Sequence, residues 1–594
     1  MKNMEKLWTT LRGFTYTINR FSITILLFVC AAVLSSYNIS IRDSNNFIEL
    51  LYSFIVGAAT FMVLQMVYEH FYRKTGIRLM FCGLAVFAAI LYYLIVEFAV
   101  KEFDTETFVR TLVLLFILLV CFIWIPSIKA KVGFSESFMV VFKAFFIVVL
   151  YSLVLFLGIS LIIMAFDTLI ASVDSQIYSY IGNIILYVYA PIHFLSLIPV
   201  YPEYEGKKSD GQDSVILNED NIEPSKFLEG LVSYIIIPVT AVFTVILLLY
   251  IILNITGDFW KDNLMEPLLV AYAITVIVVY QLAFVIRSKP ALYFRKIFPK
   301  VLIPVVLFQT ISSVIKIGEQ GITSGRYYVI IFGVFATISA MLFSIRPEHK
   351  NNVIAPVLIA LSLVSILPPV DAFTVSKHNQ INRLKAVLEE NDMFQDDKIT
   401  PNKDISTEDK QIIIDTVNYL NRMDYAEDIS WLHTYNISYD FERVFGFPQY
   451  GYGKEAEEYE AYRYYLPETT AIDISGYDFF IEAELVGRGQ GNRIAAYLLG
   501  GQNYILEQEG NEDIGELLLK DGQGSELIRY PLNDIFNRFR ENKDSSGEIS
   551  MDEAEFKIEN DKAVLRVVTR SLSFERWKDG MYQNINAYIM VKIK

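Results

Sequence analysis

The sequence has little cysteine and little histidine, three and five residues among 594. Cys30, Cys82 and Cys121 each lie within an apolar run, so no disulfide framework, zinc ribbon or cysteine nucleophile is indicated. No histidine has a partner at metal-ligand spacing, and nothing singles out a Ser-His-Asp triad. We therefore expect neither a cofactor nor an enzymatic activity.

Charged residues are scarce in the first 370 residues, where long apolar runs follow one another. The chain is 53% apolar and only 20% charged, which is unusual for a soluble protein. Because a membrane-spanning helix needs about 20 apolar residues, residues 1–370 are expected to form an all-α polytopic transmembrane bundle of about eleven helices, surrounded by membrane lipids. The eleven runs are 21–38, 47–68, 79–99, 107–126, 138–166, 180–200, 227–254, 267–287, 301–317, 326–345 and 353–370.

Lysine and arginine are unequally divided between the connections of these runs. One alternating set of connections holds nineteen of them, whereas the other holds only Arg42, Lys101 and Lys261 away from helix edges. Because positive residues are retained on the cytoplasmic side, we expect a multi-pass plasma-membrane protein whose N-terminus is cytoplasmic. An odd number of crossings then makes the C-terminal domain extracytoplasmic.

Acidic residues are concentrated after residue 370. Residues 371–594 carry 25 Lys and Arg against 42 Asp and Glu, a net charge of −17, whereas residues 1–370 carry 26 against 24. An acidic domain repels nucleic acid. We therefore expect no nucleic-acid partner, and an extracytoplasmic protein or another component of the cell envelope instead.

The acidic tail contains two kinds of pattern. Apolar residues at helical spacing and a capping serine, Ser406, predict a short helical connector over residues 371–430. From residue 431 to 594, alternating aromatic segments are separated by Gly, Asn and Asp, which predicts strands and hairpins. The tail is therefore expected to be an α+β domain with an antiparallel β sheet and one helix at 531–541.

The polar stretch KIGEQGITSGRYY lies between the ninth and tenth runs, on the side expected to be extracytoplasmic. Gly321 permits a tight turn, and Thr323 or Ser324 is suited to cap the next helix. Arg326 and the adjacent Tyr327 have two interpretations. They dock the outer domain or line an outer vestibule, or the stretch is a capped loop with an arginine at the lipid interface.

Few polar residues lie deep inside the runs. Arg110 and Lys316 are near run ends, where they can extend to the interface, and no Asp or Glu relay for a proton-driven pump is visible. The remaining polar residues form a midplane site beside proline-broken helices, or they join helices by hydrogen bonds. These candidates are Asn183, His193, Gln281 and Gln309.

The stretch NKDSSGEISMDE, residues 542–553, partly matches a calcium-binding loop. Its first ligand position holds Asn where Asp is usual, and the residues that follow predict a hairpin rather than the outgoing helix of such a motif. We therefore favour a polar loop, with calcium as the weaker alternative. The candidate ligands are Asn542, Asp544, Ser546 and Glu553.

Three stretches carry a resemblance to a known family: IGEQGITSGRYYVIIFGVF, NRLKAVLEENDMFQDDKITPNKDISTEDKQIIIDTVNYL and IDISGYDFF. With them the chain resembles the bacterial polytopic membrane proteins grouped as domain of unknown function 4153. The resemblance implies a multi-spanning architecture and no established activity, so no catalytic residue is carried over.

These observations predict a non-enzymatic integral membrane protein of the bacterial envelope, whose outer domain binds or senses an extracytoplasmic partner. The alternative is a transporter or lipid-handling carrier with a polar site near the middle of the bundle. A polar cavity reaching His193 and Gln309 favours the carrier. An outer domain attached through residues around Arg326 favours the sensor.

Overall fold

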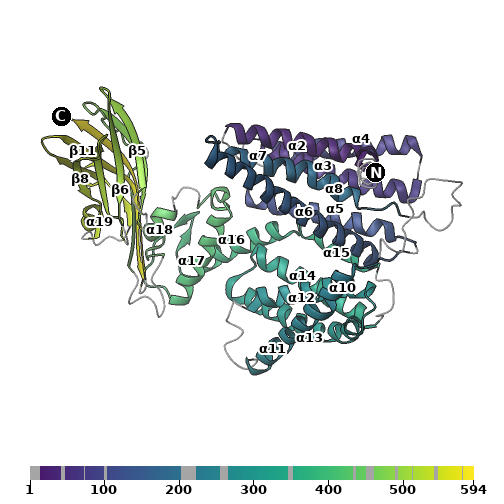
Figure 1. Ribbon diagram of the computed structural model, residues 1–594. Coiled ribbons are helices and arrows are strands. Elements are labelled where there is room, and N and C mark those ends of the chain that lie inside the picture. The colour runs from purple at the N-terminus through teal and green to yellow at the C-terminus, as the bar shows by residue number, and fades with distance from the viewer. Residues whose placement is uncertain are drawn as a thin grey trace. The chain divides into compact units, whose positions relative to one another are not determined.

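The structure is a computed structural model (Figure 1). It describes residues 14–41, 47–72, 74–99, 103–130, 132–201, 223–254, 265–345, 352–432, 437–449, 460–467, 469–487, 492–510, 513–540, 546–577 and 580–594. The chain divides into two compact units, Met1–Asn379 and Gln380–Lys594. The division falls inside one continuous helix, α16 (Ala372–Glu390).

The first unit is helical throughout its described residues, and each of the eleven apolar runs coincides with helix. The elements are α2 (Ser22–Ile41), α3 (Ile48–Val67), η1 (Tyr68–Tyr72), α4 (Thr75–Ala99), α5 (Thr105–Trp124), η2 (Ile125–Ser127), α6 (Phe134–Leu169), α7 (Gln176–Ile184), η3 (Ile185–Tyr189), α8 (Ala190–Ser196), α10 (Lys226–Leu231), η4 (Val232–Ile236), α11 (Ile237–Asn254), α12 (Met265–Val285), α13 (Lys289–Gln320), α14 (Ser324–Ile345) and α15 (Ile354–Val364).

Nine helices among the described residues are long and apolar enough to cross a membrane. The segment α7–η3–α8 is not among them, and α15 is too short. The chain is therefore a multi-pass membrane protein.

Polar side chains define several helix starts, since Asp104 accepts a hydrogen bond from Thr107 N at 2.8 Å and Ser225 accepts one from Leu228 N at 3.2 Å.

Hydrogen bonds between helix termini show which termini lie at the same end of the first unit. Arg20, just before α2, binds the carboxylate of Glu69 at 2.7 Å and the carbonyl of Ile198, after α8, at 2.6 Å. At the other end of α2, the Gln176 amide donates to the Ile39 carbonyl at 3.2 Å. The segment α7–η3–α8 therefore runs antiparallel to α2 over its whole length.

The short helix α15 is likewise tied to both ends through its flanks. Before it, Asn352 donates to Ser127 O, after α5, and accepts from Phe134 N at the start of α6, both at 2.9 Å. After it, the Ile366 carbonyl accepts from Arg110, near the start of α5, at 2.8 Å. Residues 352–366 therefore run antiparallel to α5.

Close backbone approach holds the first helices together. A Cβ at Gly57 of α3 would lie 2.6 Å from Ala89 Cβ of α4 and 3.1 Å from Leu27 Cδ1 of α2. Glycine is therefore required for these three helices to pack as they do, as at many helix contacts in membranes. Further along the chain, α12 and α14 are joined by the stacked rings of Tyr280 and Phe343, whose centroids are 3.7 Å apart.

The second unit begins with a helical layer. It contains the C-terminal half of α16, the short hairpin β1 (Phe394–Gln395) and β2 (Lys398–Ile399), α17 (Thr407–Arg422), η6 (Ala426–Asp428) and α18 (Ile437–Phe445). Leu384 and Leu388 of α16 are fully buried against Val417 and Leu420 of α17. The predicted helical stripes thus meet each other, and Ser406 caps α17 by accepting from Asp409 N at 3.0 Å.

The remainder of the second unit is a pair of β sheets. The elements are β3 (Glu460–Tyr465), β4 (Phe479–Val486), β5 (Asn492–Leu499), β6 (Gln502–Glu509), β7 (Glu516–Asp521), β8 (Glu526–Pro531), α19 (Asn533–Arg540), β9 (Ser546–Glu548), α20 (Met551–Ala554), β10 (Glu555–Glu559), β11 (Ala563–Trp577) and β12 (Gly580–Ile593). One sheet has the order β4-β12-β11-β3-β9, with β10 also paired to β11, and the other has the order β5-β6-β7-β8.

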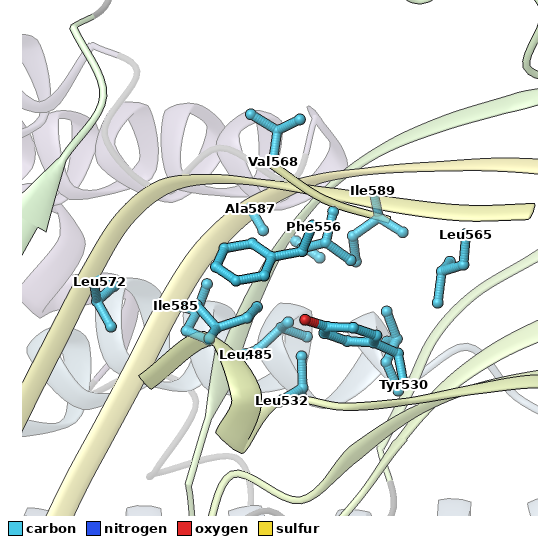
Figure 2. Packing of buried hydrophobic residues seen from close by; sticks show 14 of the residues in the cluster. Leu485, Tyr530, Leu532, Phe556, Leu565, Val568, Leu572, Ile585, Ala587 and Ile589 are labelled. Carbon is cyan, nitrogen blue, oxygen red and sulfur yellow. The ribbon is translucent and has the colours of Figure 1, made fainter. Parts of the chain in front are cut away.

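The two sheets share one apolar core (Figure 2). Leu485 of β4, Ile585 of β12 and Leu565 of β11 converge there with Tyr530 of β8 and Phe556 of β10. The antiparallel sheet and the helix near 531–541 are as predicted. The parallel pairing of β3 with β9 was not anticipated, because β9 has only three residues and no alternating pattern.

We expect Gly57→Leu to lower the melting temperature of the purified protein in detergent by several degrees, because the new side chain must separate α2, α3 and α4. Gly83→Leu on α4 is the matched control, since no atom lies within 4 Å of a Cβ there. Equal melting temperatures for the two variants would contradict the close packing at Gly57.

Candidate functional site at the start of helix α16

The first turn of α16 is organised by one buried carboxylate. Asp371 is fully buried, and its Oδ1 accepts hydrogen bonds from Phe373 N at 3.0 Å and Thr374 N at 3.1 Å. This is the geometry of an N-cap, which satisfies amides that lack partners within the helix. The negative charge also lies at the positive end of the helix dipole.

Arg110 of α5 neutralises that carboxylate. Its guanidinium lies 2.7 Å from Asp371 Oδ1 and 2.7 Å from Glu106, one turn earlier on α5. It also donates to the Ile366 carbonyl and lies over the Phe373 ring, 5.5 Å from the centroid. A single arginine therefore connects α5, the end of α15 and the start of α16.

Two further contacts hold the same segment against the loop between α13 and α14. The Tyr327 hydroxyl donates to the Val370 carbonyl, and the Ile322 amide donates to Asn379 Oδ1 at 2.7 Å. We call the residues Arg110, Asp371, Tyr327 and Asn379 the α16 anchor. All four lie in the first unit, whereas the helix that they hold continues into the second.

The loop itself is shaped by the predicted motif. Gly321 has φ 71° and ψ −177°, a conformation open essentially to glycine alone. Thr323 Oγ1 accepts from Arg326 N at 3.3 Å and so caps α14. Gly321, Thr323, Arg326 and Tyr327 therefore occupy one compact turn.

Arg326 is buried and points back to the end of α13. It donates to the carbonyls of Gly321 at 3.0 Å and Lys316 at 3.2 Å, and to Gln320 Oε1 at 2.7 Å. A positive charge at a helix C-terminus is favoured by the helix dipole. Within the motif, Arg326 shapes the loop, and Tyr327 makes the contact with the segment leading to α16.

The four polar residues proposed for a midplane site have different contacts. Asn183 donates to Ala32 O and Ser36 Oγ of α2, and Gln281 accepts from Ser135 Oγ of α6 at 2.6 Å. His193 lies among aromatic rings, with centroids of Tyr151 and Tyr189 each 5.4 Å away. Within the described part of the chain, no hydrogen bond joins any two of the four, Gln309 included.

The calcium candidate is only partly described. Asn542, Asp544 and the Ser546 side chain lie outside the described residues. The Glu553 carboxylate accepts from Ser550 N and Ser550 Oγ, both at 2.8 Å, in a capping box that starts α20. These bonds, the one from the backbone amide first, hold the pKa of Glu553 below its usual value. One candidate ligand is thus occupied as a helix cap.

A polar face on α13 was missed by the sequence analysis. Gln309, Ser313 and Lys316 follow at helical spacing and are each at most 2% exposed. Ser313 donates to the Glu266 carboxylate of α12. Lys316 is therefore buried rather than extended to the lipid interface as expected. The helical spacing of the three residues indicates a shared polar face, whereas Lys316 taken alone indicates only a charge near the end of a run.

Arg110 and Asp371 were also missed as a pair, because 261 residues separate them.

We expect Asp371→Ala to lower the free energy of unfolding by about 3 kcal/mol, since it removes a helix cap and breaks a buried ion pair. Glu106→Gln is the control, with a loss of roughly 0.5 kcal/mol expected from a partly exposed pair one turn apart on a helix. Denaturant unfolding in detergent measures both, and similar losses would contradict the central role of Asp371.

Comparison with known proteins identifies the family. The family model described as domain of unknown function (DUF4153) matches residues 14–396. The match includes the loop motif and all of α16, whereas IDISGYDFF lies beyond it. No curated protein and no solved structure matches the chain. Because the matched segment is more than half of the chain, this protein belongs to the family of domain of unknown function 4153.

Proposed function

We propose that this protein is a non-enzymatic receptor of the bacterial plasma membrane. Its N-terminus is cytoplasmic, eleven segments cross the bilayer, and the second unit binds an extracytoplasmic partner. The observation that carries the proposal is that α16 belongs to both units and that a buried ion pair holds its first turn. A change in the second unit that displaces α16 must therefore act on the α16 anchor.

The contacts at the helix ends support eleven crossings. They tie both α7–η3–α8 and the α15 segment to the two ends of the first unit, although neither is as long and apolar as the other nine. The end where α2 begins holds Arg20 and Arg78, which belong to the basic set of connections. That distribution supports a cytoplasmic assignment for this end.

The α16 anchor lies at the opposite end of the first unit. Under the proposed orientation, its charges are at the outer boundary of the bilayer, where water is replaced by lipid. An ion pair is strengthened by such surroundings but tolerates little change in its geometry. A two-state response, with the pair formed or broken, suits the transmission of a binding event.

The first experiment tests the orientation. In a variant whose three native cysteines are replaced by alanine, Ser525→Cys in the β7–β8 turn should react with a membrane-impermeant maleimide in intact spheroplasts. Ser209→Cys, in the connection expected to be cytoplasmic, should react only after lysis. Labelling of Ser525→Cys only after lysis would place the second unit inside the cell and end the proposal.

A second candidate function is a carrier, which one observation favours. Gln309 is 1% exposed, and neither Oε1 nor Nε2 has a hydrogen-bond partner among the described residues. An unsatisfied buried amide costs about 1–3 kcal/mol, and polar groups inside membranes are usually functional. Measured along the helix axes, at a rise of 1.5 Å per residue, Gln281 and Gln309 lie roughly 20 Å apart. A carrier would therefore use the polar face of α13 rather than the four residues predicted together.

We expect Gln309→Leu to raise the free energy of unfolding by about 1 kcal/mol, because it removes unsatisfied polar atoms. Gln281→Leu is the matched control and should give no gain, since removing its own unpartnered Nε2 is offset when Ser135 loses its acceptor. Thermal unfolding in detergent compares the two. A stability of Gln309→Leu no higher than that of the control would show that the amide is satisfied and would remove the observation favouring a carrier.

A further inference from the structure

The second unit ends each of its sheets in edge strands, whose outer amides and carbonyls have no partner within the sheet. The strand orders make β4 and β9 the edges of one sheet, with β10 beside β11, and β5 and β8 the edges of the other. Proteins usually protect such edges with charges, prolines or very short strands. The edge strands of these two sheets differ in how much of this protection they have.

Four of these edges carry protection along most of their length. The edge strand β4 has Glu482 and Glu484, β8 has the Glu526–Arg529 pair and ends at Pro531, and β9 has only three residues. The strand β10 has alternating charges from Glu555 to Glu559. In β5, by contrast, the charge of Arg493 and the register shift between Arg493 and Ala495 are confined to the start of the strand. The six residues 494–499 are uncharged, and Leu498 is 66% exposed.

The β5 strand is held firmly enough to act as a template. Tyr497 points to the core side, where its ring lies 3.5 Å from that of Phe479 and 6.2 Å from that of Tyr504 between centroids. On the opposite face Ala496 and Leu498 are exposed, and they pair with Ile505 and Asn503 of β6. One side of β5 is thus fixed by stacking, and no strand among the described residues of the second unit pairs with its outer edge.

We propose that the outer edge of β5 binds an extended segment of the extracytoplasmic partner as an added antiparallel strand. This inference rests on the proposed receptor function and assigns it a surface. Main-chain hydrogen bonds supply affinity in this mode of recognition, and alternate side chains supply specificity. The apolar side chains of the bound segment would lie beside Leu498 and Ala496.

Charge identifies the kind of segment that fits. Residues 371–594 have a net charge of −17, and in this sheet Glu507, Glu509 and Glu516 outnumber the two cations that they pair with, Lys520 and Arg529. A segment with lysine or arginine between its apolar residues is therefore attracted. A second copy of this chain is disfavoured, because two units of −17 repel each other.

The test uses the full-length protein in nanodiscs and a fluorescein-labelled heptapeptide of alternating lysine and valine. Fluorescence anisotropy should show saturable binding. The same peptide N-methylated at alternate amides should bind at least roughly tenfold more weakly, since it lacks the donors that a β strand requires. Equal binding of the two peptides would mean that charge alone attracts them and would overturn the proposal.

Matched variants localise the binding. Leu498→Lys adds a charge to the edge and should weaken peptide binding at least roughly tenfold, whereas Asn503→Lys adds the same charge on the adjacent interior strand and should change it less than roughly threefold. Equal effects, no binding by the unmodified protein, or self-association that Leu498→Lys abolishes would each overturn the proposal. The maleimide experiment tests the receptor function separately, so a negative peptide result removes this surface alone.

Discussion

An ion pair between Arg110 and Asp371 is the interaction on which the arrangement of the first unit around α16 depends. Asp371 is fully buried, and removing a carboxylate from water costs several kcal/mol unless a partner and hydrogen bonds compensate. Arg110 provides the partner, and the first amides of α16 provide hydrogen bonds to Oδ1, whereas Oδ2 has no hydrogen-bond partner among the described residues. The start of α16 is therefore fixed by electrostatics rather than by shape alone.

The loop between α13 and α14 helps to hold the same helix start in place. Arg326 satisfies carbonyls at the end of α13, and Gly321 permits the backbone to reverse. The loop then presents Tyr327 to Val370 and the Ile322 amide to Asn379. Ion pair and loop together hold residues 370–379, and the same helix contributes Leu384 and Leu388 to the core of the second unit.

Periodicity predicted most of the fold, because each apolar run is a local signal. Residues 21–38 or 326–345 are long enough to be recognised without knowledge of their neighbours, and Ser406 marks the start of α17 through its own side chain. The antiparallel pairing of β11 with β12 follows similarly from adjacent alternating segments. Such features depend on residues close together in the chain.

The site was less predictable, because its residues meet only through the fold. The loop motif was recognised, but Arg110 and Asp371 are 261 residues apart, and neither is remarkable in its own segment. Lys316 was expected to be exposed at the lipid interface but is buried, since a residue near a helix end can be covered by a neighbouring helix that the sequence does not reveal. For the same reason the partners of polar residues inside the runs, such as Ser135 for Gln281 and Ser36 for Asn183, are not visible in the sequence.

Hydrogen exchange along α16 in the full-length protein tests the central claim most directly. If one helix joins the two units, amides on both sides of residue 379 should open together, with a common free energy set by the ion pair and by the core around Leu384. Protection of residues 375–379 combined with rapid, independent exchange of residues 380–388 would contradict the account.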